Sequence, residues 1–327
     1  MVIINRRKMN LIETQIAIKY LKDNFEKMLA KKLKLVRVSA PLFVDKNSGL
    51  NDDLNGIEET VGFNVKNEHV EIVQSLAKWK RYALGEYKFP EEIGLYTDMN
   101  AIRKDETLDN LHSIYVDQWD WEKIVRHEQR NKKYLFSIVK KIYRVIYSLS
   151  LKSEKKWKFS YQLPKNITFI SSSELEKKYP NNTNKERECL ICKQCRAVFI
   201  YQIGWPLKNG LPHDGRAADY DDWKLNGDII LFDDAIDAPI ELSSMGIRVD
   251  ADSLVKQLEY KGELAKLSNP YCQAIMNNQL PLTIGGCIGQ SRLCMYYLQK
   301  KHIGEVQSSY WPKQMREQLE KEGIKLL

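Results

Sequence analysis

The sequence has 327 residues, of which 43% are hydrophobic and 29% are charged. This balance is typical of a globular protein with a sizeable core and argues against intrinsic disorder. No uncharged apolar run approaches the roughly 18 to 20 residues that cross a bilayer, and no continuous apolar segment of a secretory signal follows the basic N-terminus. We therefore expect a cytoplasmic protein with no membrane partner, and we exclude the secreted and fibrous classes.

The net charge is +8, from 51 basic and 43 acidic residues. It permits an anionic partner such as a nucleotide or RNA, but it does not require one. Much of the excess lies on apparent helices, as in residues 22–34 and 132–144, where acidic residues are interspersed. Such a pattern is typical of a solvated helix face, so we do not expect nucleic acid to be a partner.

Three of the six cysteines, Cys189, Cys192 and Cys195, form two overlapping C-x-x-C spacings. A structural zinc site or an iron–sulfur cluster needs four ligands, and no fourth cysteine follows at a suitable spacing. The same spacing places three small apolar side chains along one side of a helix. We favour reduced structural thiols, which are the rule in a cytosolic chain.

The first half of the chain alternates helical and strand patterns. Apolar residues at steps of three and four between positions 18 and 28 predict an amphipathic helix, with Asn10 and Glu13 as its N-terminal cap. Residues 35–38 predict a strand, which Pro41 places at a sheet edge. We then expect a loop at 47–56, a strand at 69–75, a helix at 76–84 ended by Gly85, a hairpin of strands 94–103 and 112–121, and a long helix over 135–149.

The second half shows no internal repeat and no linker. We expect strands at 167–170 and 197–203 around one helix, whose cap is formed by Ser173 and Glu176. A loop over 204–223 precedes two paired strands, 225–232 and 240–249, and a glycine-rich turn at 285–289 leads into a helix at Gln290. Successive strands at hairpin distance favour an α+β fold with an antiparallel sheet.

Several predicted strands carry acidic or amide side chains among apolar ones. Period-two alternation places Gln118 and Asp120 on one face, and Glu241 on the same face as Ser243. Burying an unpaired carboxylate is costly, so polar groups on several strands indicate that one sheet face lines a polar cavity. Asp228 and Glu241 are candidate Mg²⁺ ligands, because this ion prefers hard oxygen ligands and often bridges phosphates.

Three arginines complement these carboxylates. Arg103 and Arg248 end predicted strands, and Arg292 follows the glycine segment. A guanidinium matches a phosphate group with two parallel hydrogen bonds, so the combination suggests nucleoside triphosphate chemistry, although each arginine alone also fits a surface ion pair. No phosphate-loop, zinc-protease or serine-hydrolase motif occurs, which favours phosphoryl or adenylyl transfer.

Four stretches are long enough to be specific: SLAKWKR at 75–81, HSIYVDQWDWE at 112–122, ELSSMGIRVDAD at 241–252 and TIGGCIGQSR at 283–292. They closely resemble the ammonia-dependent asparagine synthetases, the type A aspartate–ammonia ligase family, in order and spacing from about residue 10 to the end. The resemblance implies the class II aminoacyl-tRNA synthetase-like fold, an antiparallel sheet flanked by helices, as a single catalytic domain over residues 1–327. It also implies a homodimer.

The resemblance further implies that the enzyme makes L-asparagine from L-aspartate, ammonia and ATP with Mg²⁺. The β-carboxylate of aspartate would attack the α-phosphorus, releasing pyrophosphate and forming β-aspartyl-AMP, from which ammonia would displace AMP. No glutaminase domain is apparent and residue 2 is not cysteine, so we expect free ammonia as the nitrogen donor.

The resemblance assigns the site residues individually. Arg103 would clamp the α-phosphate. A carboxylate in the segment 216–223 would attract ammonium and accept its proton, giving the neutral nucleophile. Aspartate would be bound by Asp52, Lys80, Gln118, Asp120, Ser244 and Arg248; ATP by Gly286, Gly289 and Arg292, with Asp228 and Glu241 holding the metal; and Arg216, Asp219 and Asp221 would close the site. Of these, Asp52, Arg103, Asp221 and Arg292 are assigned a catalytic role.

Three features depart from the family pattern. Asp53 stands where the family often has asparagine, and Ala218 stands where proline is common, which is expected to loosen that loop. The three-cysteine run has no counterpart in the family. Cys287 lies inside the last of the four stretches, where it is a candidate target for thiol reagents.

Two alternatives remain. An aspartyl- or asparaginyl-tRNA synthetase-like paralogue would need a tRNA-reading module, for which about ten residues before the first helix leave no room. A nonenzymatic RNA-binding paralogue fits the +8 charge, but it predicts decay of Arg103, Asp228, Glu241 and Arg292, and all four are present.

Overall fold

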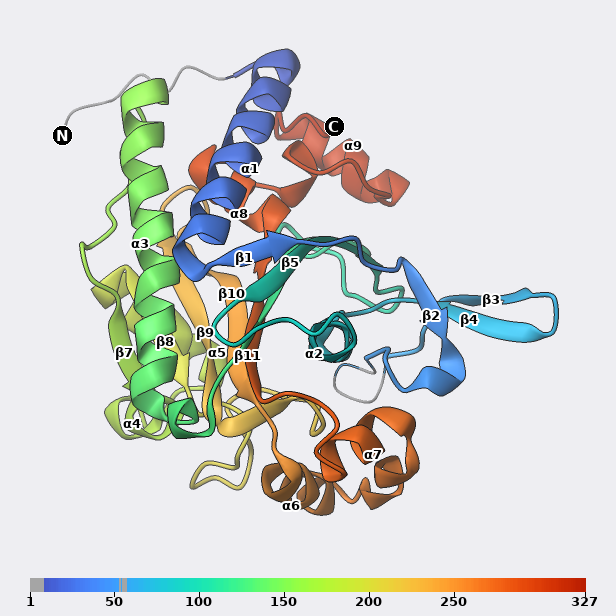
Figure 1. Ribbon diagram of the computed structural model, residues 1–327. Coiled ribbons are helices and arrows are strands. Elements are labelled where there is room, and N and C mark those ends of the chain that lie inside the picture. The colour runs from blue at the N-terminus through green and yellow to red at the C-terminus, as the bar shows by residue number, and fades with distance from the viewer. Residues whose placement is uncertain (1–8, 53, 55–57) are drawn as a thin grey trace.

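The computed structural model describes residues 9–52, 54 and 58–327, and two sheets organise this part of the chain. The strands are β1 (Leu35–Arg37), β2 (Phe43–Asp45), β3 (Gly62–Val65), β4 (Glu68–Ile72), β5 (Gly94–Ile102), β6 (Tyr115–Ile124), β7 (Thr168–Ser171), β8 (Ala197–Tyr201), β9 (Asp221–Asp233), β10 (Ala238–Arg248) and β11 (Thr283–Gly289). Eight of them form the main sheet in the order β1-β5-β6-β11-β10-β9-β8-β7, and β2-β4-β3 form a small sheet that projects to one side (Figure 1).

Helices surround the main sheet. The α-helices are α1 (Leu11–Leu33), α2 (Ala77–Glu86), α3 (Lys132–Trp157), α4 (Ser172–Lys178), α5 (Asn184–Cys195), α6 (Ala251–Lys261), α7 (Pro270–Met276), α8 (Gln290–Tyr297) and α9 (Lys313–Lys321), and the 3₁₀ turns are η1 (Lys46–Ser48), η2 (His127–Gln129), η3 (Leu264–Ser268) and η4 (Ile303–Glu305). None of the helices in the described ranges has the length and apolar character needed to cross a membrane.

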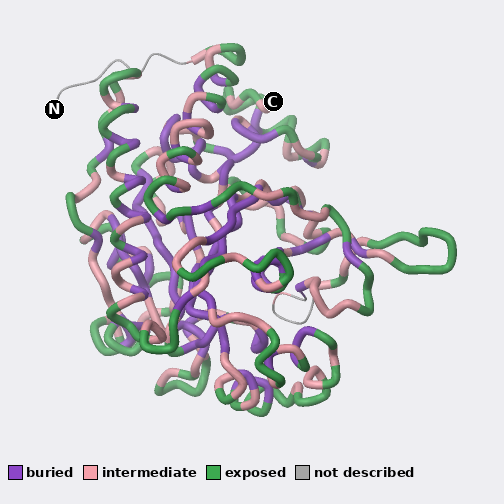
Figure 2. Tube along the Cα trace, in the orientation of Figure 1, coloured by how far each residue is buried: buried purple, intermediate pink, exposed green. Residues whose placement is uncertain are grey.

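One face of the main sheet is covered by α1, α3 and α8, and it holds the largest apolar core. Phe25 of α1 stacks on Trp119 of β6 with ring centroids 4.9 Å apart, and Ile142 of α3 is fully buried. Figure 2 shows buried chain concentrated in the sheet and in the helix sides that face it. Burial of apolar surface on this scale provides the main driving force for folding.

Two apolar clusters cover the opposite face toward its two sides. Leu84 of α2 packs with Leu95 of β5, and Ile191 of α5 packs with Ile230 of β9. Between these two apolar clusters, the middle strands β6, β11 and β10 present polar side chains instead. The fold therefore leaves a polar opening in the middle of this face, between α2 and α5.

Several expectations are confirmed. Asn10 and Glu13 form the reciprocal capping box of α1, β1 is an edge strand, and the predicted hairpin is β5 and β6, paired antiparallel over nine positions. The long helix is α3, capped by Asn131, whose side chain accepts from the Tyr134 amide. The sheet is antiparallel from β5 to β8 as expected, whereas the edge strands β1 and β7 pair in parallel with their neighbours.

Other expectations are corrected. The glycine-rich segment 285–289 is not a turn but belongs to strand β11, at the middle of the sheet. The predicted loop 204–223 ends at 220, because β9 already begins at Asp221. Two helices rather than one separate β7 from β8, and the cap of the first is formed by Ser171 and Glu174, two residues earlier than predicted. Helix α2 continues through Gly85 to Glu86.

A bulge in β10 overturns the expectation that Glu241 and Ser243 share a face. The pairing with β9 shifts between these residues, so that Glu241 lies opposite Ile230 but Ser243 lies opposite Ile229. A shift of one residue reverses the side-chain alternation. Ser243 is consequently buried on the core face, while Glu241 and Ser244 both face the polar opening.

Candidate active site

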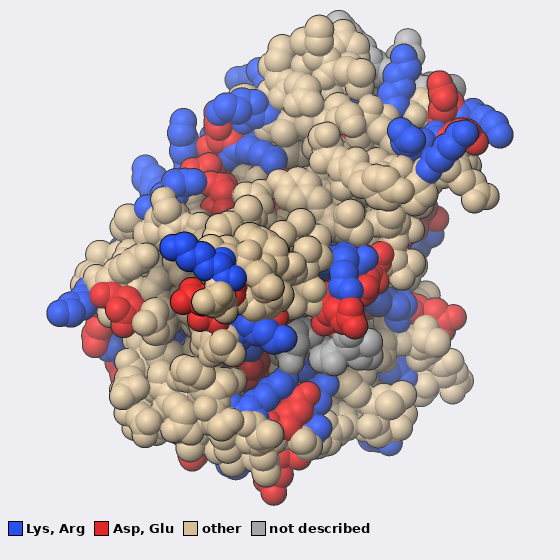
Figure 3. Space-filling view, turned by 90° about the vertical axis from the view of Figure 1, so that its right-hand side faces the viewer, with Lys and Arg blue, Asp and Glu red and all other residues tan. Residues whose placement is uncertain are grey.

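The polar opening is a cavity of about 400 Å³. Its floor is a row of cross-strand neighbours, in which Cys287 lies between Asp120 of β6 and Ser244 of β10. Ser244 in turn lies opposite Asp228 of β9. Paired residues of antiparallel strands project to the same face, so residues far apart in the sequence meet here. Around the middle of the face seen in Figure 3, basic and acidic side chains lie side by side rather than in a patch of one sign.

Most of the predicted site residues line this cavity. They are Asp52, Lys80, Arg103, Gln118, Asp120, Arg216, Asp221, Glu241, Ser244, Arg248, Gly286, Gly289 and Arg292. Two others, Asp219 and Asp228, lie behind the surface of the cavity, and both are buried.

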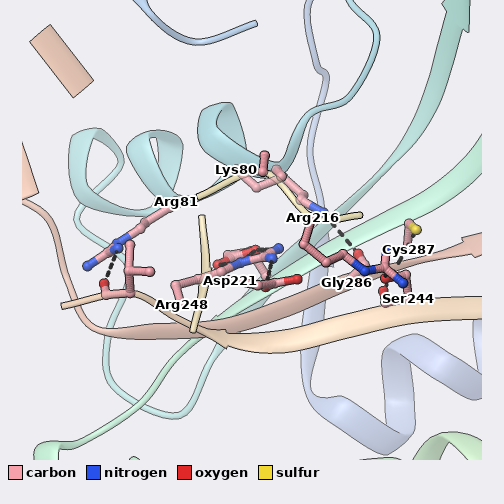
Figure 4. A network of polar contacts seen from close by, with 12 residues as sticks. Lys80, Arg81, Arg216, Asp221, Ser244, Arg248, Gly286 and Cys287 are labelled. Atoms are coloured by element: carbon pink, nitrogen blue, oxygen red, sulfur yellow. Dashed lines mark hydrogen bonds and ion pairs between the residues drawn. The ribbon is translucent and has the colours of Figure 1, made fainter. Parts of the chain in front are cut away.

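At one end of the cavity, Arg248 is held between two carboxylates, all of them buried. Its Nε and Nη2 donate to the two oxygens of Glu122 at 2.9 and 2.7 Å, and Nη1 donates to Asp221 (Figure 4). We call these three residues the Arg248 cluster. One guanidinium and two carboxylates give the cluster a formal charge of −1. Burial raises the pKa of Asp221 above its usual value, although Arg248 opposes the shift.

The Arg248 cluster explains why position 285 is glycine. Gly285 lies directly opposite Glu122 in the sheet, and a Cβ there would lie 1.7 Å from Glu122 Oε2 and 2.6 Å from Arg248 Nη2. At Gly286 a Cβ would meet the Met245 Cβ at 2.5 Å. These glycines therefore serve close approach between neighbouring strands rather than a turn.

Helix α2 contributes three buried cations. Lys80 bonds to Asp120 and also donates to the Gly286 carbonyl at 2.9 Å. Arg81 donates to the carbonyls of Pro281 and Val249 at 2.9 and 2.7 Å (Figure 4), which ties the helix to the strands below it. One oxygen of Asp120, Oδ2, is buried and has no hydrogen-bond partner among the described residues. It is available to a ligand with a positive charge, such as an α-ammonium group.

The third cation of α2, Lys78, explains the position of Asp219. Lys78 Nζ lies 2.6 Å from Asp219 Oδ2, and both side chains are almost completely buried. The Asp219 carboxylate is thus used in an ion pair beside the cavity and does not line it. Ala218, next to it, is fully buried and packs with Trp223, and its carbonyl accepts a hydrogen bond from Gln257, so this part of the loop is held in place.

Near the middle of the cavity, Arg216 approaches the floor from the loop before β9. It bonds to Asp228, and its Nη1 donates to Ser244 Oγ at 3.3 Å. Burial raises the pKa of Asp228 well above its usual value, and Glu241 adds to the shift, while Arg216 opposes it. The other carboxylate oxygen, Asp228 Oδ1, is buried and lacks a hydrogen-bond partner in the part of the chain that the structure describes.

These carboxylates fit a divalent cation. Glu241 is near enough to raise the pKa of Asp228, and the cavity lies beside both residues. A bound cation would satisfy Asp228 Oδ1 and offset the repulsion between the two carboxylates. Among the described residues no group of three or more His, Cys, Asp or Glu is placed to hold a metal, so the protein would supply two ligands and a substrate would complete the coordination.

Two arginines face the cavity from different elements. Arg103, at the end of β5, is held by weak hydrogen bonds of 3.3 to 3.4 Å to the Gln74 carbonyl. Arg292 in α8 donates to the Glu241 carbonyl at 3.1 Å, and the two side chains lie 3.9 Å apart. Among the contacts of the described residues, neither guanidinium forms a two-point pair with a carboxylate, so both offer donors to an anionic ligand.

Asp52 lies at the cavity wall. It is buried, its Oδ1 accepts from the Leu54 amide at 3.0 Å, and its carbonyl accepts from Gln74 Nε2 at 3.2 Å. Asp53, whose carboxylate departs from the family pattern, lies outside the described residues.

The sequence interpretation missed Glu122, the principal partner of Arg248. It alternates with Gln118 and Asp120 on β6, so continued period-two counting would have found it. It also missed Asp117, which accepts from Lys22 at 3.0 Å and from the Ser291 amide and Gln307 at 3.1 Å. Those partners come from distant elements, and no local pattern indicates them.

The three-cysteine run lies in α5, as expected for structural thiols. Cys192 is fully buried against β8 and β9, and Cys195 packs against the same cluster. Burial raises the pKa of the Cys192 thiol far above its usual value, which keeps it protonated and unreactive.

The comparisons with known proteins agree with the geometry. The family model of aspartate–ammonia ligase matches residues 12–323. Aspartate–ammonia ligases of Bacillus cytotoxicus and Bacillus cereus are 57% and 56% identical over 321 residues, which cover 97% of this chain and 98% of theirs. At this identity the tRNA synthetase-like alternative is not favoured.

Solved structures show the fold. Asparaginyl-tRNA synthetase of Pyrococcus horikoshii in complex with asparaginyl-adenylate superposes with a TM-score of 0.64 at 14% identity, over 91% of this chain and 70% of that one. The enzyme of Entamoeba histolytica gives 0.60 at 13%, over 90% of this chain and 66% of its own, just under two thirds. The chain belongs to the aspartate–ammonia ligase family, and it is a ligase with the catalytic fold of class II aminoacyl-tRNA synthetases.

Proposed function

We propose that the protein makes L-asparagine from L-aspartate, ammonia and ATP, with β-aspartyl-AMP as the intermediate. One observation carries the proposal: a single cavity places the arginines Arg103 and Arg292 beside the Lys80–Asp120 pair and the Arg248 cluster. The arginines suit a polyphosphate, the Lys80–Asp120 pair suits a carboxylate and an α-ammonium group, and the negative Arg248 cluster suits ammonium. The balanced reaction converts aspartate, ATP and ammonia into asparagine, AMP and pyrophosphate.

In the first step, an oxygen of the aspartate β-carboxylate forms a bond to the α-phosphorus of ATP, and the bond from that phosphorus to the β-phosphate bridge breaks. Negative charge develops on the leaving pyrophosphate. Arg103 stabilises the α-phosphate and Arg292 the terminal phosphates, because fixed cations in a partly dry site lower the energy of a charged transition state.

Aspartate is oriented by groups on the cavity floor and on α2. Asp120 Oδ2 accepts from the α-ammonium group, and Lys80, fixed by Asp120 and the Gly286 carbonyl, binds a carboxylate. Gln118, Ser244 and Asp52 line the same space and complete the hydrogen bonds. Holding both reacting groups in place removes much of the entropic barrier to the first bond.

The Arg248 cluster serves the second step. Its formal charge of −1 attracts ammonium into the cavity, and the raised pKa of Asp221 makes this carboxylate a proton acceptor that leaves neutral ammonia. The ammonia nitrogen then attacks the β-carbonyl carbon, and the bond from that carbon to the AMP oxygen breaks. Asp221 releases the first proton to solvent and accepts the second one, which the nitrogen loses as the amide forms.

Mg²⁺ is the divalent cation that best suits Asp228 and Glu241, because both offer hard oxygen ligands beside a polyphosphate site. When bound, the ion neutralises phosphate charge. The family resemblance supports the same assignment.

We further propose that residues 1–327 form one catalytic domain and that two copies associate through α1. Ile12 and Ile16 on this helix are 74% and 63% exposed, and Val36 on the adjoining edge strand is 50% exposed. Such apolar residues on neighbouring elements suit a symmetric contact with a second copy. A measurement of molecular mass in solution tests this assembly.

The function is tested by incubating the purified protein with ATP, Mg²⁺ and aspartate, and with either ammonium or glutamine. We expect equimolar asparagine and AMP with ammonium. Formation of ADP in place of AMP would refute the adenylate intermediate. AMP that appears only when tRNA is added would instead assign the protein to the tRNA synthetases.

A further inference from the structure

Lys185, on the first turn of α5, lies at the opening of the cavity and takes no part in the contacts proposed for aspartate. It lines the cavity together with Asp214, Arg216 and Glu241. Its side chain is 81% exposed, so the ammonium group faces the solvent-filled opening rather than the protein interior.

The backbone of this turn is fixed on both sides. Thr183 caps α5 by a reciprocal capping box with Glu186. Asn184 Nδ2 donates to the carbonyls of Pro212 and His213 at 3.1 and 2.7 Å, which fastens the helix to the loop that carries Arg216. Lys185 is therefore presented to the cavity from a rigid support, and only its side chain is free to rotate.

The ammonium group of Lys185 is only weakly held in the protein. Its contact within the described residues is with Glu188 Oε2 at 3.2 Å, while the other oxygen of Glu188 lies 3.0 Å from His213 Nε2. An ion pair with so exposed a lysine is easily exchanged for a stronger partner. Partial loss of hydration beside the cavity wall would lower the pKa of Lys185, but the carboxylates of Glu188, Asp214 and Glu241 outweigh this effect and raise it, so the group carries its charge at neutral pH.

Glu241 acts electrostatically on both Lys185 and Arg292. Arg292 Nη1 lies 3.9 Å from Glu241 Oε2, and Glu241 also contributes to the field at Lys185. Arg216 approaches the same region through its bond to Asp228. Three cations thus surround the two carboxylates assigned to the metal. When a metal ion binds Asp228 and Glu241, these carboxylates no longer neutralise the positive charge of the three side chains as fully. The negatively charged phosphate oxygens of a ligand would then balance that charge.

We propose that Lys185 binds the β- and γ-phosphates of ATP and remains bound to the pyrophosphate as it leaves. This assignment rests on the ATP-dependent reaction proposed above. As the bond between the α-phosphorus and the β-phosphate bridge breaks, the additional negative charge appears on the pyrophosphate, where the ammonium group compensates it without any proton transfer. A single-point contact suits a lysine at the opening, because pyrophosphate must also depart.

The test compares binding of three ligands with Mg²⁺ by isothermal titration calorimetry: ATP, pyrophosphate and AMP. Lys185→Met should raise the dissociation constants of ATP and pyrophosphate about tenfold and leave that of AMP unchanged, because AMP lacks the two outer phosphates. Lys185→Arg, which keeps the charge, should restore most of the affinity. Lys193→Met is the matched control, since Lys193 lies on the same helix but pairs with Asp237 outside the cavity.

Each outcome decides the assignment. Equal affinities of Lys185→Met and Lys193→Met for ATP and pyrophosphate would overturn it, and so would an equal loss of AMP binding, which would indicate general damage to the site. Thermal unfolding of both variants identifies any loss of structure. If the wild-type protein makes no asparagine, the proposed function fails first, whereas asparagine synthesis with unchanged binding by Lys185→Met refutes only the role of Lys185.

Discussion

Substitution of Gly285 by alanine tests whether the Arg248 cluster determines the geometry of the site. The new Cβ would lie 1.7 Å from Glu122 Oε2, and real Cβ atoms essentially never approach another atom within 3.0 Å. Glu122 must then move by more than 1 Å, which disrupts its hydrogen bonds of 2.7 and 2.9 Å to Arg248. Breaking such a buried pair costs about 3 to 5 kcal/mol.

The effect on activity follows from the same displacement. A shift of about 1 Å in a group that positions the reactants lowers the rate about 10²-fold, so Gly285→Ala should reduce kcat/KM for ammonium by about that factor. Steady-state assays give the rate, and urea unfolding gives the free energy of unfolding.

A double-mutant cycle separates this explanation from general damage. Glu122→Ala removes the clashing carboxylate and the pair, and it leaves Arg248 Nη2, 2.6 Å from the new Cβ, without the partner that holds it there. Because this end of the arginine side chain can then shift, Gly285→Ala should cost little more once Glu122→Ala is present. If the two substitutions are instead additive in both stability and rate, the clash with Glu122 is not the cause, and the reasoning is refuted.

Three further predictions concern charged groups. Because burial raises the pKa of Asp221, its carboxylate is protonated at a higher pH than usual, and kcat/KM for ammonia should fall as the pH decreases through that pKa. Asp221→Asn should lower kcat/KM about 10²- to 10⁴-fold and abolish this decrease of the rate on the acidic side of the pH profile. If the acidic decrease persists in Asp221→Asn, it is caused by the titration of another group. Chelation of Mg²⁺ should stop the reaction, and Asp228→Asn should raise the Mg²⁺ concentration for half-maximal rate at least about tenfold; an unchanged Mg²⁺ dependence would exclude Asp228 as a ligand. Asp120→Asn leaves the buried Lys80 without its carboxylate partner. Calorimetry should therefore show aspartate binding weakened about tenfold, and urea unfolding should show a loss of about 3 to 5 kcal/mol in the free energy of unfolding. Wild-type values for both quantities would contradict the proposed pair.

The elements with a strong periodic pattern were predictable from the sequence. Helix α1 with its Asn10 cap and the β5–β6 hairpin follow directly from apolar spacing, which depends only on local sequence. The polar cavity was also predictable, because Asp120 and Asp228 are too costly to bury among apolar neighbours without a partner or ligand.

Features that depend on distant partners were not predictable. Lys78, Lys80 and Arg81 give α2 the appearance of a solvated helix, but all three are buried because their acceptors lie on strands and loops elsewhere in the chain. The bulge after Glu241 depends on the pairing of β10 with β9, and local alternation therefore misplaced Ser243. Gly285 and Gly286 look like turn residues until their cross-strand neighbours are known.

The position of β11 has a consequence for synthesis of the protein. This strand is among the last elements of the chain, yet it lies between β6 and β10 at the middle of the sheet. Until residue 289 has emerged from the ribosome, β6 and β10 each present an unpaired edge, which favours association with other chains. The floor of the cavity then forms from contacts between residues more than 160 positions apart, such as Asp120 and Cys287. Ordering of these long-range pairs is slow, so a nascent chain that ends before β11 cannot assemble the site, and completion of the polypeptide becomes the step that permits activity.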